Sequence, residues 1–157
     1  ARALVPSLGP SPGVVVLRSD ALRKRLFGVG EAERLPPGAY APAVTERVYA
    51  GLLDRARAVL GAGHAVVLDA VHARPEERAS AARVAAEAGV RFDGIWLDAP
   101  LGTRIARIAA RSGDASDATA EVAERQEGYD LGPLEWLRTN AGRDAGETLA
   151  AALERLV

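Results

Sequence analysis

Two aspartates closely follow apolar runs that are typical of buried strands. Asp20 comes just after the run at residues 14–17, and Asp69 ends the run at residues 64–69. In an open parallel sheet, ligands bind outside the carboxyl ends of the strands, so both carboxylates are candidates for a binding site. An acid in the position of Asp69 can orient Mg²⁺ or its water shell near nucleotide phosphates. The alternatives are structural, with Asp20 as a helix N-cap and Asp69 as the cap of a turn.

Three basic residues, at positions 23–25, follow Asp20 in the first turns of a predicted helix. Cations near a helix N-terminus oppose the helix dipole, at a cost of about 0.3–1 kcal/mol each. Their placement favours a site for an anion, and the alternative is a solvated basic surface. The next stretch, 28–41, is irregular and rich in Gly and Pro, and loops of this length often serve as lids or substrate loops. Tyr40 lies in this loop and is a candidate for substrate binding, and Arg23 is a candidate for binding an anion.

Three further arginines share one edge of a predicted helix. Arg104, Arg107 and Arg111 lie within about 60° of one another at about 100° per residue. Such a row of cations is self-repelling unless an anion faces it. The polar segment 113–117 follows, so a lid at about 104–128 could bring these arginines onto a transferring phosphoryl group. The alternative is an ordinary arginine-rich surface helix.

Cysteine and histidine chemistry contributes little to this sequence. There is no cysteine, which excludes a disulfide framework and a thiolate metal site. His64 and His72 lie at opposite ends of one strand and its exit, without the spacing of metal ligands. We expect a structural role for both.

The alternation of apolar strands with amphipathic helices predicts an α/β fold with a parallel sheet and helices on both faces. The clearest helix covers about 44–60 and ends at glycines, and another begins at Pro75 with two glutamates in its first turn. The other predicted elements are buried strands at 14–17, 64–69, 92–97 and 134–139, and helices after Asp20, from Pro100, at about 117–129 and from Asp144.

Composition restricts the class of protein. The 157 residues fit one domain, with 48% hydrophobic but only 4% aromatic residues. The charges balance, 20 basic against 21 acidic, which disfavours a protein that coats a long polyanion. No apolar run approaches the roughly 20 residues that cross a bilayer. We expect a cytoplasmic protein with a small-molecule partner and no membrane contact, while a polynucleotide 5′-hydroxyl stays open as a substrate.

Three segments taken together resemble a known family more specifically than any one alone. They are residues 17–26 around Asp20, residues 66–70 around Asp69, and the Arg-Ser-Gly-Asp-Ala-Ser-Asp-Ala run at 111–118. In this order they closely resemble the predicted-kinase branch of the P-loop superfamily that carries the "AAA domain" label. Chloramphenicol phosphotransferase, gluconate kinase, zeta toxin and polynucleotide kinase look like more distant relatives. The resemblance covers nearly the whole chain, and family members occur alone or fused behind an aminoglycoside-phosphotransferase-like domain.

The resemblance implies a role for each candidate residue, with ATP and Mg²⁺ as cofactors. Asp20 would accept the proton of the acceptor hydroxyl, and Arg23 would contact substrate or phosphate. Asp69 would hold Mg²⁺, through water. Arg107 and Arg111 would be lid arginines that stabilise the transferring phosphate. Asn140 and Arg143 would lie beside the adenine.

One part of the family pattern is missing. Relatives carry a Gly-rich loop with a lysine and a Ser or Thr, which cradles the phosphates. This sequence begins at Ala1-Arg2-Ala3-Leu4, which resembles the helix after that loop. The strand that feeds the loop is central in the fold the family implies, between the strands that end at Asp69 and near Asp98. We therefore expect a single domain, 1–157, truncated at its N-terminus and inactive as a kinase by itself.

Three hypotheses remain from the sequence. The first is an ATP-dependent kinase that phosphorylates a hydroxyl of a small acceptor in the intact parent protein. The second is a non-catalytic remnant that keeps the fold to bind a ligand or partner. The third is a nucleotide hydrolase or switch, which would not need an acid at Asp20.

Overall fold

The computed structural model describes residues 1–7, 13–111 and 115–156. These residues form four strands, six α-helices and two short 3-10 helices. In chain order the elements are η1 (Arg2–Ser7), β1 (Val14–Arg18), α1 (Ser19–Leu26), η2 (Pro37–Tyr40), α2 (Pro42–Gly61), β2 (Ala65–Asp69), α3 (Pro75–Glu87), β3 (Ile95–Asp98), α4 (Leu101–Ala109), α5 (Ala120–Glu127), β4 (Leu137–Asn140) and α6 (Ala145–Leu156).

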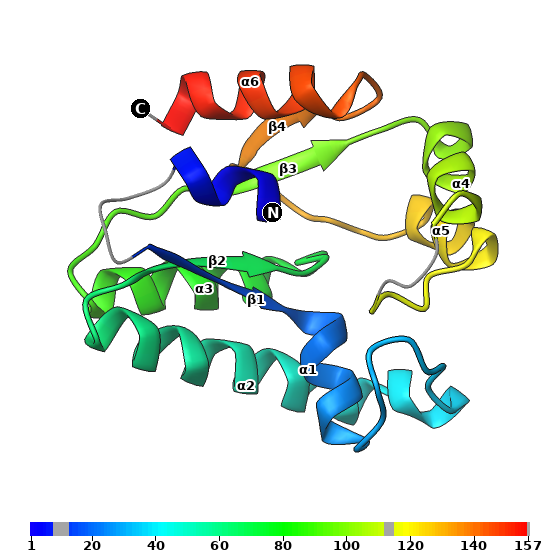
Figure 1. Ribbon diagram of the computed structural model, residues 1–157, viewed down its shortest axis with the longest axis horizontal. Coiled ribbons are helices and arrows are strands. Elements are labelled where there is room, and N and C mark those ends of the chain that lie inside the picture. The colour runs from blue at the N-terminus through cyan, green and yellow to red at the C-terminus, as the bar shows by residue number, and fades with distance from the viewer. Residues whose placement is uncertain (8–12, 112–114, 157) are drawn as a thin grey trace.

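The strands form two separate parallel pairs. Strand β1 pairs with β2 in a register that sets Val14 opposite Ala65, and β3 pairs with β4 in a register that sets Ile95 opposite Leu137. All four arrows point the same way in Figure 1, with α2 and α3 on one side of the strands and η1 and α6 on the other. The α/β class and the parallel pairing agree with the sequence prediction. The sheet, however, is divided into two halves.

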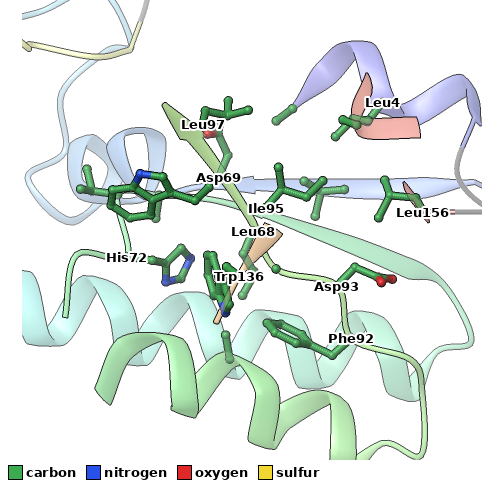
Figure 2. Close-up of a pocket in the computed structure, with 18 of the residues that line it drawn as sticks. Leu4, Leu68, Asp69, His72, Phe92, Asp93, Ile95, Leu97, Trp136 and Leu156 are labelled. Carbon is green, nitrogen blue, oxygen red and sulfur yellow. The ribbon is translucent and has the colours of Figure 1, made fainter. Parts of the chain in front are cut away.

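A cavity of about 1300 Å³ separates the two halves. Every residue of β2 and of β3 lines it, whereas β1 and β4 contribute only Val14 and Arg138. Figure 2 shows Leu68 and Ile95 from the two inner strands within this cavity. No strand among the described residues lies between β2 and β3. The cavity therefore occupies the position at which the family resemblance puts a central strand.

The strands are less buried than their apolar sequences predict. No residue of β1 or β2 is fully buried, and among all four strands only Thr139 is. Leu97 at the end of β3 is 57% exposed. Strands of a parallel sheet are normally buried on both faces. The prediction of buried strands is wrong for this chain, because the inner edges of β2 and β3 face the cavity instead of a neighbouring strand.

The best-packed region lies beneath the first strand pair. Leu22 of α1 packs with Val48 and Leu52 of α2, and Leu17 and Ala70 flank this cluster. Val48 and Leu52 are one turn apart on α2, which is the spacing that the sequence predicted for a core-facing stripe. Helix α2 thereby packs α1 against the strand pair β1–β2.

Most other element boundaries shift by a few residues from their predicted positions. The helix at Pro75 begins as predicted, and Gly89 adopts a left-handed φ of 66° just after it. The predicted strand at 92–97 is found at Ile95–Asp98, and the helix predicted at 117–129 covers only Ala120–Glu127. The strand predicted at 134–139 lies at Leu137–Asn140. Part of the predicted polar lid segment, residues 112–114, lies outside the described residues. No helix in the described ranges is both long and apolar enough to span a membrane.

The approach to β3 requires a glycine. A Cβ atom added to Gly94 would overlap three ring atoms of Trp136. The Gly94 carbonyl also accepts a hydrogen bond from the Leu137 N–H at 2.9 Å, so the backbone cannot move away without loosening the start of the β3–β4 pair.

Replacing Gly94→Ala should therefore destabilise the fold by about 1–3 kcal/mol, the usual cost of overpacking. The midpoint of urea denaturation measures this change. Gly102→Ala on α4 is the matched control, because no atom lies within 4 Å of the added Cβ. Equal midpoints for the Gly94→Ala variant and the parent would contradict the close packing of Trp136.

Candidate active site

Asp20 lies in the first turn of α1, directly beyond the carboxyl end of β1. Burial raises the pKa of its carboxyl group above the ordinary value. The Ser116 hydroxyl and the charges of Arg18 and Arg23 act in the opposite direction, and Asp69 adds a weaker upward effect. A carboxylate with a raised pKa is a better proton acceptor, because the optimal pKa of a catalytic base lies near the working pH.

Asp69 lies at the same edge of the first strand pair. It is opposite Arg18 in the β1–β2 register, and the Arg18 Nε atom lies 3.3 Å from Asp69 Oδ2. The parallel pairing therefore brings the exits of both strands together, as the sequence predicted. The Asp69 carboxylate forms an ion pair with Arg18, rather than capping the next turn.

Mg²⁺ can use Asp69 only as one ligand among several. The described residues contain no group of three or more His, Cys, Asp or Glu that could hold a metal ion. Mg²⁺ is commonly bound by one or two carboxylates together with water and substrate phosphates. Asp69 is 42% exposed at its side chain and lines the cavity, so it fits a contact of this kind, directly or through water.

Arg23 is buried against the loop that precedes α2. Its Nη1 donates to the Ala39 carbonyl at 2.7 Å and to Thr45 Oγ1 at 3.3 Å, and its guanidinium lies 4.9 Å from the centre of the Tyr40 ring. Only 6% of Arg23 is exposed, yet its Nε has no hydrogen-bond partner. The two predicted substrate-binding residues therefore lie together beside Asp20, and Arg23 retains one free donor.

The basic run after Asp20 does not oppose the helix dipole. Because α1 ends at Leu26, Arg23, Lys24 and Arg25 lie in its last turn, where the dipole favours cations. The predicted dipole cost is therefore wrong, and the dipole gives no support to an anion site at these residues. Lys24, the only lysine in the sequence, is 1% exposed and is bonded to protein acceptors.

The arginines of α4 bind groups of the protein. Arg107 donates from Nη1 to the Ala141 carbonyl at 2.5 Å and from Nη2 to the Arg143 carbonyl at 2.7 Å. Arg104 forms an ion pair with Glu127 of α5. Arg111 follows the end of α4 and is exposed.

The two predicted adenine-side residues belong to the turn that Arg107 holds. Asn140 ends β4, and its Oδ1 accepts a hydrogen bond from the Gly142 N–H at 2.8 Å. The Arg143 carbonyl is an acceptor for Arg107. Arg107 and Asp69 line the central cavity, whereas Asp20, Arg23 and Tyr40 lie outside it. The candidate residues thus form two groups, and Asp69, which lies beside Asp20 and also lines the cavity, is between them.

His72 is the most constrained residue of the cavity wall. Its φ of 47° is the one positive value among the described non-glycine residues. Its N–H donates to the Tyr49 hydroxyl at 3.0 Å, and the centre of its ring lies 5.3 Å from that of a Trp136 ring. Figure 2 shows the side chains of His72 and Trp136 next to each other. The ring is buried and Nδ1 has no hydrogen-bond partner. Burial, with a smaller effect from Arg78, lowers the pKa of His72 to about 4.

Acidification should destabilise the chain through His72. Between about pH 6.5 and 4 the unfolded state binds a proton that the native state does not, so the free energy of unfolding falls by about 3 kcal/mol as the pH drops. NMR titration should find an imidazole midpoint of about 4 for the signals that disappear in His72→Asn, a residue that tolerates positive φ. A midpoint near 6.5 would contradict the buried, neutral ring.

Sequence reasoning missed the residues that join these parts. Ser116 and Asp117 were assigned to a polar link, yet Ser116 acts on Asp20 and Asp117 binds Lys24. Arg78 donates to four carbonyls and fixes the turn after β2. Nothing local in the sequence signals these contacts, because the partners of Ser116 and Asp117 are more than 75 residues away in the chain.

Residues 1–129 match a family model described as "AAA domain". Over 128 residues the chain is 39% identical to an uncharacterised protein of Mycobacterium bovis and to two from strains of Mycobacterium tuberculosis. Each alignment covers 76% of this chain but 26% of the relative, so the chain spans about a quarter of their length.

One solved structure, that of the tunicamycin resistance protein of Deinococcus radiodurans, aligns with 91% of this chain and 84% of its own. The TM-score is 0.49 and the sequence identity is 14%. The family model covers well over half of the chain, and the family assignment rests on that model and not on this structure. The chain therefore belongs to the AAA-domain family, a kinase-like group of P-loop NTPases, which implies nucleotide binding in general.

Proposed function

We propose that the intact protein is an ATP-dependent kinase that phosphorylates a hydroxyl group of a small molecule. The observation that carries the proposal is the Asp20 carboxyl group, which has a raised pKa and lies beside Asp69 at the carboxyl ends of two parallel strands. Membership of a kinase-like family supports phosphoryl transfer as the reaction. A nucleotide hydrolase or switch would not need an acid at Asp20.

Asp20 would accept the proton of the acceptor hydroxyl. When bound, Mg²⁺–ATP supplies the γ-phosphoryl group, whose bond to the β–γ bridging oxygen breaks as a bond to the acceptor oxygen forms, with ADP leaving. Arg23 lies in the same region as Asp20 and would contact the acceptor. Asp69 would orient the metal or its water shell.

We propose that the phosphate cradle comes from a part of the intact protein other than these residues. The sequence has no Gly-Lys loop, and its single lysine is buried. The cavity has two parallel strand edges as walls, and a fifth parallel strand between them would complete the sheet. We assign the Gly-rich loop to the end of that strand, where Asp69 and Arg107 line the cavity.

The acceptor is proposed to be a small molecule. The near-zero net charge and the scarcity of aromatic residues disfavour a long nucleic acid. Arg23 and Tyr40 would form its pocket, with Arg107 and Arg111 steadying the phosphoryl group, Asn140 and Arg143 near adenine, and residues 104–128 acting as the lid. The greater length of the relatives leaves room for a fused domain, which we propose to be aminoglycoside-phosphotransferase-like.

A non-catalytic remnant is the second candidate. The engagement of Arg107 with two backbone carbonyls favours it, since a lid arginine would have to leave them to reach a phosphate. This candidate requires the 157 residues alone to fold cooperatively and to bind a ligand without ATP.

Asp20→Asn in the intact protein should reduce phosphoryl transfer by about 10²–10⁴-fold, the usual contribution of a general base. ATP affinity should be unchanged, because Asp20 lies outside the cavity. ADP release with a panel of alcohols, sugars, nucleosides and polynucleotide 5′-hydroxyls measures the rate, and calorimetry measures ATP binding. Asp54→Asn on the exposed face of α2 is the matched control. Full turnover by Asp20→Asn would reject the kinase in favour of a hydrolase or switch.

Extending the chain at its N-terminus by about 20 residues of its own reading frame, roughly a strand plus a loop, should stabilise the fold. Each edge of the cavity would gain about 5 hydrogen bonds worth about 1 kcal/mol each. Thermal melts followed by circular dichroism should show a higher and sharper transition for the extended protein, and only that protein should bind ATP. Identical melts, with no ATP binding by the extended protein, would favour the non-catalytic remnant.

A further inference from the structure

The side chain of Lys24 connects α1 to a distant part of the chain. Its Nζ donates to the carbonyls of Glu31 and Glu33 at 2.7 Å each and to Asp117 Oδ1 at 3.0 Å. All three protons of the ammonium group are therefore used, and the side chain is 1% exposed. Lys24 thus holds both the loop at 28–41 and the segment that contains Asp117.

Asp117 binds the same loop with its other oxygen. Its Oδ2 accepts from the Leu35 N–H at 3.0 Å and from the Tyr40 hydroxyl at 3.1 Å. Burial acts to raise the pKa of Asp117, but the hydrogen bonds from Leu35, Lys24 and Tyr40 outweigh it and lower the pKa. Both charges of this pair are compensated, and the side chain of Asp117 is only 13% exposed.

The network ends on the proposed acceptor residues. The Tyr40 hydroxyl donates a hydrogen bond to Asp117, and the Arg23 guanidinium lies over the Tyr40 ring. The side chain of Ser116, the chain neighbour of Asp117, acts to lower the pKa of the Asp20 carboxyl group. Asp117 therefore contacts Tyr40, which lies against the proposed substrate arginine, and its neighbour acts on the proposed base.

We propose that Asp117 is a positioning residue of the acceptor site. With Lys24 it fixes the loop at 28–41 that places Tyr40 and Arg23, and it holds its chain neighbour Ser116 near the Asp20 carboxylate. The assignment of an acceptor site rests on the proposed function, but the hydrogen bonds of Asp117 do not. A long Gly- and Pro-rich loop has few internal constraints, so buried charge-assisted bonds at Glu31, Glu33 and Leu35 account for its fixed position.

The titration of Asp20 tests the action of Ser116 on Asp20 in the full-length protein. Carboxyl ¹³C NMR, with the Asp20 signal assigned by its loss in Asp20→Asn, should show a higher pKa for Asp20 in Ser116→Ala. Ser116→Thr keeps the hydroxyl and should restore the parent value. Ser80→Ala on α3 is the control for loss of a serine elsewhere. If Ser116→Ala lowers only the melting temperature and leaves the Asp20 midpoint in place, Ser116 is structural and its placement near the Asp20 carboxylate is overturned.

The exchange of the Leu35 amide tests the Asp117 contact. Asp117→Ala alone leaves Lys24 buried and uncompensated, so it is expected to unfold part of the protein. The double variant Lys24→Met with Asp117→Leu removes both charges of this pair and should fold. Its Leu35 amide should lose protection from hydrogen exchange, while amides of α2 such as Leu52 keep theirs. A Leu35 amide as protected as in the parent would overturn the role of Asp117.

These outcomes are separable from the kinase proposal. Neither the Asp20 midpoint nor Leu35 exchange needs ATP, an acceptor or turnover. A protein that transfers no phosphoryl group but shows both changes would retain the positioning network and lose only the proposed function. A protein that transfers phosphate but shows neither change would retain the proposed function and lose the positioning network.

Discussion

The separation of the sheet into two parallel pairs is the constraint on which the rest of the structure depends. Each inner strand uses its backbone hydrogen bonds on one edge only, and apolar residues from both sides line the space between them. The well-packed cluster of Leu22, Val48 and Leu52 stabilises the first pair alone. The second pair, β3 with β4, is covered by α6, which packs on β4, and is supported by the close approach of Gly94 to Trp136. The two halves of the candidate site follow this division, with Asp69 at the boundary.

Local sequence patterns predicted the elements better than the contacts between them. The apolar spacing in α2 and the Pro75 start of α3 reflect forces that act within a few residues, so they were predictable. The apolar runs of β1 and β2 also predicted strands, but not their partial exposure, because exposure depends on a neighbouring strand that no local pattern encodes. The meeting of Asp20 and Asp69 was predictable because parallel strands end at one edge.

The electrostatic partners of the basic residues were the least predictable part of the site. A run of three cations gives no indication of which of them is buried, and the acceptors of Lys24 are backbone carbonyls and a carboxylate 93 residues away. Arg107 likewise satisfies carbonyls of the Ala141–Arg143 turn, which only the β3–β4 pairing brings near α4. For Lys24, burial makes such bonds obligatory, since an unpaired charge in the interior is costly. Charged side chains of this protein therefore hold its own segments together through hydrogen bonds, and others remain candidates for binding a ligand.

Both tryptophans of the sequence, Trp96 and Trp136, line the space between the half-sheets. Indole emission depends on the polarity and the quenching groups around the ring, and His72 lies against Trp136. Any segment that enters between β2 and β3 must displace water from these rings. Tryptophan fluorescence therefore reports on the cavity between β2 and β3, and no third tryptophan in the sequence contributes to the signal.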